Sequence, residues 1–187
     1  MILMAVLFSS PLQASTPSPR AVPASEACRC DDKMLALGFE AFDQDMTGGW
    51  RELADKPGCG GAAADLIRAY RMNSQERIPL LYWHEAQLRA LNGDHAAAIP
   101  LMEKSRRAPE DDRFGWNPYA DATIAFLGND RKALLVARRR LDAVKRPAGL
   151  PADRPWPPNL AVVDALIRCF GRSYRIAYGG TCAAATR

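Results

Sequence analysis

The sequence predicts an all-α protein built from three helical hairpins, and two observations carry this prediction. The first is a glycine that recurs every 35 residues, at Gly58, Gly93 and Gly128, with an alanine five residues after each one. The second is an apolar segment with helical spacing on both sides of each glycine. A fixed interval of this length is typical of stacked supersecondary units. Because glycine can adopt a positive φ and so end a helix, each unit is expected to be helix, tight turn, helix.

The elements ahead of and within the first hairpin follow from local signals. Residues 31–44 are expected to form an N-terminal capping helix, since Asp31 and Asp32 at its start suit the helix dipole. The first hairpin is expected over 47–72. Its first helix should be short, because Pro57 interrupts it.

The second and third hairpins are expected over 80–109 and 117–146. Asp94 and Asn129 follow the second and third glycines, so their side chains are expected to accept hydrogen bonds from the free amides that open the next helix. Three units are about the smallest number that stacking supports, so the array needs covered ends. Residues 147–158 are too rich in proline to be helical, and 158–171 are expected to form a C-terminal capping helix, followed by the tail of the domain 28–187.

The middle hairpin resembles a tetratricopeptide repeat, a family with a period of about 34 residues. The residues that carry the resemblance are Trp83, Ala86, Gly93, Ala98 and Pro109. It implies a short right-handed superhelix whose first helices line a concave, peptide-binding groove. The residues expected there are Trp83, His84, Gln87 and Tyr119, with Glu52 and Asp55 at one end. The alternative is that Trp83 is a core residue, and its exposure distinguishes the two.

Five cysteines are present, at positions 28, 30, 59, 169 and 182. We expect a Cys169–Cys182 disulfide, because the pair is close in sequence and Gly179-Gly180 lets the tail turn back. We also expect Cys59 to pair with Cys28 or Cys30, which leaves one thiol over. The alternative for Cys28, Cys30 and Cys59 is a zinc site with a histidine, although only one paired ligand motif exists.

The motifs of common enzymes are missing, so a non-enzymatic function is expected, with neither cofactor nor metal. His84-Glu85 begins like a zinc-protease motif, but Leu88 stands where the second histidine would be. The glycines at 58–61 lack the lysine of a phosphate-binding loop. We therefore predict a protein-interaction or scaffolding module with a protein or peptide partner. A small enzyme with its site in the groove is the main alternative.

Charge offers a third possibility. The net charge is only +4, but basic residues recur every seven positions over 131–146 and form a stripe opposite the apolar face. Such a stripe favours anions or nucleic acid, although an ordinary solvated helix face looks the same.

The N-terminus indicates export. Residues 1–14 are expected to be a signal peptide, because an apolar run from Ile2 to Phe8 is followed by small residues. A frayed apolar end is the alternative, since no basic residue precedes Arg20. Residues 15–27 are rich in proline and serine and predict a disordered linker. With the cysteines, these features place the protein in the periplasm or outside the cell, and no later stretch is apolar enough to span a membrane.

Overall fold

The computed structural model describes residues 28–74 and 77–182. Within these ranges every regular element is helical, so the predicted all-α class is confirmed. The expected signal peptide and linker lie outside the described residues. No described helix combines the length and the apolar character that crossing a bilayer requires.

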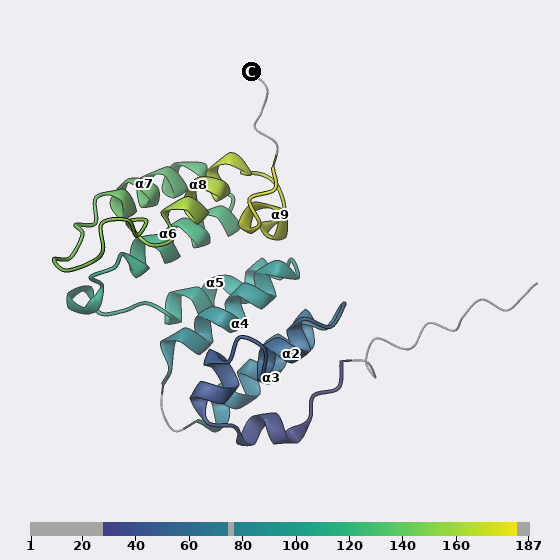
Figure 1. The fold of residues 1–187 in the computed structure, drawn as a ribbon. Helices are drawn as coiled ribbons and strands as arrows, with labels where there is room; N and C mark the ends of the chain where they lie inside the picture. Colours follow the sequence, from purple (N-terminus) through teal and green to yellow (C-terminus); the bar gives the residue numbers. More distant parts are fainter. Residues whose placement is uncertain (1–27, 75–76, 183–187) are drawn as a thin grey trace, which may run out of the picture.

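The helices follow the predicted order of hairpins. Figure 1 shows the hairpins stacked in sequence order, with α2/α3 at one end, α4/α5 in the middle and α6/α7 beside the C-terminal helices at the other end. The elements are η1 (Asp32–Ala36), η2 (Glu40–Gln44), α2 (Trp50–Ala54), α3 (Gly60–Asn73), α4 (Pro79–Leu91), α5 (His95–Lys104), η3 (Pro109–Asp111), α6 (Trp116–Leu127), α7 (Arg131–Asp142), α8 (Leu160–Arg168) and α9 (Tyr174–Tyr178).

The N-terminal segment differs from the single capping helix expected over 31–44. It contains a 3₁₀ turn and a π-helical turn, separated at Leu37, whose backbone is extended. The hydroxyl of Tyr70 in α3 donates a hydrogen bond to the carbonyl of Leu37 (2.9 Å), and the ring of Tyr70 stacks on Phe42 at 3.7 Å. This segment is therefore shaped by its contact with α3 more than by its own helical periodicity.

The hinges between paired helices use two geometries. Gly58 and Gly93 have φ values of +80° and +83°, as expected for glycines that end a helix. In the third hinge Gly128 has φ −80°, and the left-handed residue is Asn129, with φ +57°. Asn129 is therefore not the cap that we expected. The carboxylate of Asp130 accepts from the amide of Ala133 (2.9 Å), as Asp94 does from Ala97 in the second hinge (3.1 Å).

Two hydrophobic cores hold the stack together, and α4 contributes to both. Leu81 and Leu88 belong to the core shared with η2, α2 and α3. Trp83, Ala86 and Ala90, on another face of the same helix, belong to the core shared with α5–α9. The α4 helix is consequently buried from two sides and joins the first hairpin to the rest of the fold.

The C-terminal segment closes the stack, as expected. Residues 143–159 form an irregular connector, after which α8 packs against α6 and α7. The short α9 then packs on both α8 and α4, although it is far from α4 in sequence. The guanidinium of Arg175 in α9 donates to the carbonyl of Leu91 at the end of α4 (3.0 Å), which ties the tail to the middle hairpin.

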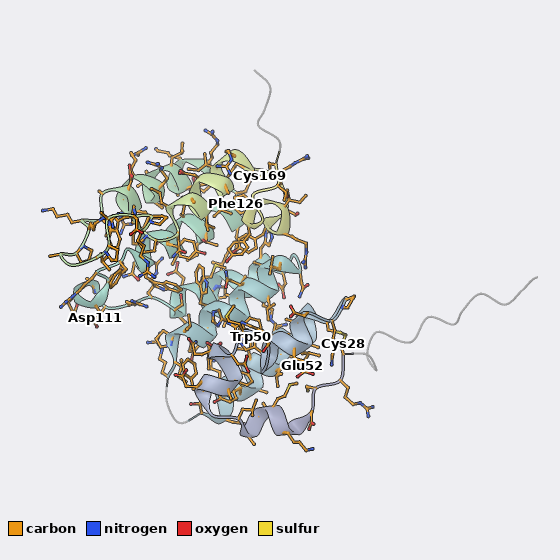
Figure 2. The ribbon with its side chains drawn as sticks, in the orientation of Figure 1. Cys28, Trp50, Glu52, Asp111, Phe126 and Cys169 are labelled. Carbon is orange, nitrogen blue, oxygen red and sulfur yellow. A yellow bond between two sulfur atoms is a disulfide. The ribbon has the colours of Figure 1, made fainter. Side chains whose placement is uncertain are left out.

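Two disulfides fasten the ends of the described chain, and both agree with the sequence prediction. Cys28 pairs with Cys59 and so ties the N-terminal segment to the first hinge, while Cys169 pairs with Cys182 after α9. Figure 2 shows that Cys28 and Cys169 lie in opposite parts of the fold. Cys30 is the exposed, unpaired cysteine of the described residues. Two such bonds indicate folding in an oxidising compartment.

Removing the first disulfide tests its share of the stability. We expect Cys28→Ser/Cys59→Ala to lower the free energy of unfolding by about 3–4 kcal/mol, because the bond closes a long loop. Guanidinium titration measures the difference, and Cys30→Ser serves as the control. An unchanged midpoint for the double variant would show that this bond does not stabilise the fold.

A second test concerns the hinge conformation. An added Cβ at Gly93 meets no atom within 4 Å, so Gly93→Ala should cost only the strain of the left-handed backbone, about 1–2 kcal/mol. Gly61→Ala near the start of α3 has no such strain and should stabilise by about 0.5 kcal/mol. Thermal unfolding should show a lower midpoint for Gly93→Ala and a higher midpoint for Gly61→Ala. Equal destabilisation by the two substitutions would contradict the left-handed conformation assigned to Gly93.

Candidate functional site

The main candidate site is a cleft bordered by α2, the first hinge, α4 and α9. Its volume is about 530 Å³, within the range of ligand-binding sites. The lining residues are Trp50, Arg51, Ala54, Asp55, Lys56, Pro57, Gly58, Gly60, His84, Gln87, Leu88, Leu91, Asn92, Arg175 and Tyr178. The cleft thus combines segments that are more than 100 residues apart in the chain.

Three of the six residues expected to bind a peptide line this cleft. His84 and Gln87 lie on α4, one helical turn apart, and Asp55 follows α2. Glu52 does not join them, although it is in the same short helix as Trp50. It is exposed and lines a separate depression with Arg29 and Lys33. The structure therefore brings together part of the predicted set.

Trp83 and Tyr119 are sealed inside the protein, each only 3% exposed. Their rings pack against each other at 5.0 Å, and Trp83 also contacts Trp116 at 4.9 Å. Burial raises the pKa of the Tyr119 hydroxyl well above its ordinary value. By the exposure criterion, both residues are packing residues between the second and third hairpins, and neither ring is available to a peptide.

A buried carboxylate organises the wall of the cleft. Asp43, on η2, is completely buried and accepts hydrogen bonds from the Nδ1 of His84 (2.6 Å) and the indole Nε1 of Trp50 (2.9 Å). The side-chain amide of Gln44 donates to its second oxygen (2.6 Å). These bonds fix the imidazole of His84 and the ring of Trp50, both of which line the cleft.

The charge of Asp43 depends on these donors. Burial raises the pKa of a carboxyl group, but the hydrogen bonds from His84, Trp50 and Gln44 and the charge of His84 outweigh it. The pKa of Asp43 is therefore lowered from its ordinary value, and the group is ionised at neutral pH. The guanidinium of Arg51 donates to the backbone carbonyl of Asp43. It lies 4.2 Å from the centre of the Trp50 ring.

The chemistry open to this wall is hydrogen bonding and proton transfer by His84. Its Nδ1 is bound to Asp43, and its Nε2 has no hydrogen-bond partner among the described residues. A carboxylate that orients an imidazole in this way is also found where histidine acts as a general base. The lining of the cleft has no serine, threonine or cysteine side chain. Within residues 28–74 and 77–182, no cluster of three metal-ligating side chains is present.

The basic stripe expected over 131–146 is interrupted. The α7 helix ends at Asp142, so Lys145 and Arg146 lie outside it. Arg138 is paired with Asp142 (2.8 Å) and Asp164 (3.0 Å). Arg146 donates to two carbonyls in the connector. Several members of the stripe thus serve the fold, which weakens its use as an anion-binding face.

Arg175 and Tyr178, which line the cleft, and Asp43, which holds His84 in its wall, were not identified from the sequence. Arg175 and Tyr178 come from the tail, and the signal that could have placed them is Cys182, whose bond to Cys169 folds the tail back. Asp43 and His84 are separated by 41 residues. The only local sign that Asp43 pairs with His84 is that Asp43 follows Phe42 in an apolar stretch.

The chain was compared with protein-family models, curated proteins and solved structures, and none of the three comparisons finds a match. The properties of the cleft therefore rest on its own geometry.

The role of Asp43 can be tested by its pH dependence. Asp43→Asn should cost about 3 kcal/mol at pH 7, because His84 and Trp50 lose a buried charged partner. Since folding lowers the pKa of Asp43, its contribution is present above the ordinary value of 3.8 and is lost as pH falls below it. Denaturant titrations of wild type and variant should therefore show a constant gap above pH 3.8 that narrows progressively as the pH falls below that value.

Asp55→Asn is the matched control, because Asp55 is exposed and forms no ion pair among the described residues. It should change the stability little over the same pH range. A gap between wild type and Asp43→Asn that widens as the pH falls would contradict the lowered pKa of Asp43.

Proposed function

We propose that this protein is a non-enzymatic protein-interaction module of an oxidising compartment, such as the periplasm or the extracellular space. Two disulfides support the compartment. The stacked hairpins α2/α3, α4/α5 and α6/α7 support a short right-handed superhelix of the tetratricopeptide type as its framework. Such a framework presents side chains from successive hairpins to one partner.

The observation that carries this proposal is the cleft between α2, α4 and α9. Its wall is formed by two consecutive hairpins together with the closing helix. Tyr178 is 40% exposed at its edge, and Trp50 is fixed within it by Asp43. Aromatic side chains with polar groups are enriched where proteins bind peptides. Leu88 and Leu91 add an apolar floor between them.

A second candidate, a small enzyme with its site in this cleft, has one observation in its favour. The buried carboxylate of Asp43 holds His84 with its free ring nitrogen available to a ligand. Histidine held in this way can accept a proton from water or from a substrate. The lining offers no serine, threonine or cysteine nucleophile to complete a covalent mechanism. We therefore favour binding, and any activity would depend on His84.

Peptide selection tests the binding function. Random peptides would be selected on immobilised wild-type protein, and the affinity of the best sequence measured by calorimetry. Tyr178→Ala should weaken binding about tenfold, because it removes an exposed aromatic contact. Ile176→Ala is the matched control: Ile176 is equally exposed on the same helix but does not line the cleft. Equal effects of the two changes, or no selected peptide, would contradict the proposal.

A further inference from the structure

The side chains that line the cleft carry an excess of positive charge. One of these cations, Arg51, has Asp45 outside the lining as an electrostatic partner. Arg51, Lys56 and Arg175 line it, and Asp55 is its one acidic lining residue. Among the described residues, these four groups form no ion pair within 4 Å. Most ion pairs of the described chain lie elsewhere, at Arg71, Arg89, Arg106, Arg138 and Arg140. In the cleft wall, His84 pairs with the buried Asp43.

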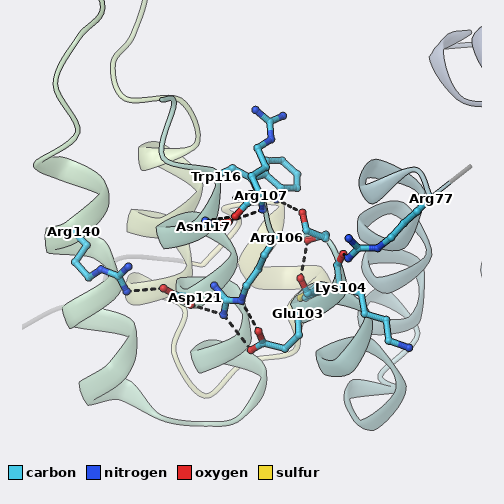
Figure 3. A network of polar contacts seen from close by, with 11 residues as sticks. Arg77, Glu103, Lys104, Arg106, Arg107, Trp116, Asn117, Asp121 and Arg140 are labelled. Carbon is cyan, nitrogen blue, oxygen red and sulfur yellow. Dashed lines mark hydrogen bonds and ion pairs between the residues drawn. The ribbon is translucent and has the colours of Figure 1, made fainter. Parts of the chain in front are cut away.

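The groove between α5, α6 and α7 shows the opposite arrangement. It is lined by three basic and three acidic residues: Arg106, Lys132 and Arg140 with Glu103, Asp121 and Asp130. Figure 3 shows Asp121 bridging Arg106 (2.5 Å) and Arg140 (2.6 Å), while Arg106 also bonds to Glu103. The charges of that groove neutralise one another. Two cations of that groove, Arg106 and Arg140, are therefore paired with lining carboxylates, whereas those of the cleft are not.

The cleft's two arginines are held in place by neutral groups. Arg51 donates to the carbonyl of Asp43 and lies over Trp50, and Arg175 donates to the carbonyl of Leu91. A guanidinium has five N–H donors, so both side chains keep donors for a ligand. The carboxylate of Asp43 does not neutralise them directly, because it is buried and bound to His84, Trp50 and Gln44.

We infer that the ligand of this cleft is an acidic segment of a partner protein, in which carboxylate side chains alternate with apolar ones. This inference rests on the proposed binding function and adds the charge of the ligand. The cations recognise the carboxylates. Leu88, Leu91 and Tyr178 contact the apolar side chains between them. A polyanion such as nucleic acid would need a larger and more concentrated basic surface than three cations supply.

The test uses three synthetic octapeptides in which phenylalanine alternates with glutamate, glutamine or lysine. Each is titrated into the isotopically labelled full chain and followed by the amide and indole resonances of cleft residues. The glutamate peptide should shift Trp50, Gln87 and Tyr178 and bind about tenfold more tightly than the glutamine peptide. Its affinity should fall between 50 and 300 mM salt, because exposed charges are screened. The lysine peptide should not bind.

Charge reversal at one position provides the matched variants. Lys56→Glu should weaken the glutamate peptide about tenfold, since it replaces an attractive contact by a repulsive one. Lys132→Glu makes the same change of charge on α7, away from the cleft, and should leave the affinity within twofold. Thermal unfolding of both variants shows whether each remains folded. Equal effects of the two substitutions would overturn the inference.

The remaining outcomes separate this inference from the proposed function. If the glutamine peptide binds in the cleft as tightly as the glutamate peptide, the acidic ligand is wrong and peptide binding stands. If inorganic phosphate at 1 mM produces the same shifts, the cleft recognises small anions, and an acidic protein segment is overturned. If no peptide shifts the cleft residues, both proposals fail.

Discussion

The burial of α4 from two sides is the constraint on which the rest of the structure depends. Leu81 and Leu88 enter one core, and Trp83, Ala86 and Ala90 enter the other. On a further face, Glu85 bonds to Arg71 of α3 (2.8 Å). Besides Tyr82 and Arg89, which are partly exposed beside Glu85, the stripe left for solvent on this limited perimeter is that of His84, Gln87 and Leu91. This stripe is the floor of the cleft. The position of the candidate site thus follows from how α4 is packed.

The same constraint explains why Trp83 is a packing residue and His84 is a site residue, although they are neighbours in sequence. Successive helix residues point about 100° apart. When Trp83 meets Tyr119 and Trp116 in the second core, His84 is directed toward η2 and meets the carboxylate of Asp43. A tetratricopeptide-like register predicts that both residues face one groove. The second core, shared with α6 and α8, turns the aromatic residue inward.

Features that depend on local chemistry were predictable from the sequence, and those that depend on distant contacts were not. The glycine hinges at 58 and 93, the cap at Asp94 and the Cys169–Cys182 bond each involve neighbours in the chain. In the third hinge, however, Asn and Asp are adjacent, and the sequence does not show which one is left-handed and which one caps. The break at Leu37 depends on Tyr70, 33 residues away. The cation of Arg175 reaches the cleft only because α9 folds back onto α4.

The two walls of the cleft beside α4, formed by α2 with the first hinge and by α9, are each fastened by a disulfide. The α2 and α9 helices are five residues long, and helices of that length are not stable on their own. Cys59 lies between Gly58 and Gly60, which line the cleft, and its bond to Cys28 fastens this wall. Cys182 follows α9 and fastens the other wall to α8. Trp50 and Leu53 of α2 and Tyr174 and Ala177 of α9 are buried in the two cores, so each bond adds to the packing that holds its wall. A site built from such short elements is therefore suited to a compartment in which the disulfides persist, and the cations that α2 and α9 contribute are held in position by the same bonds.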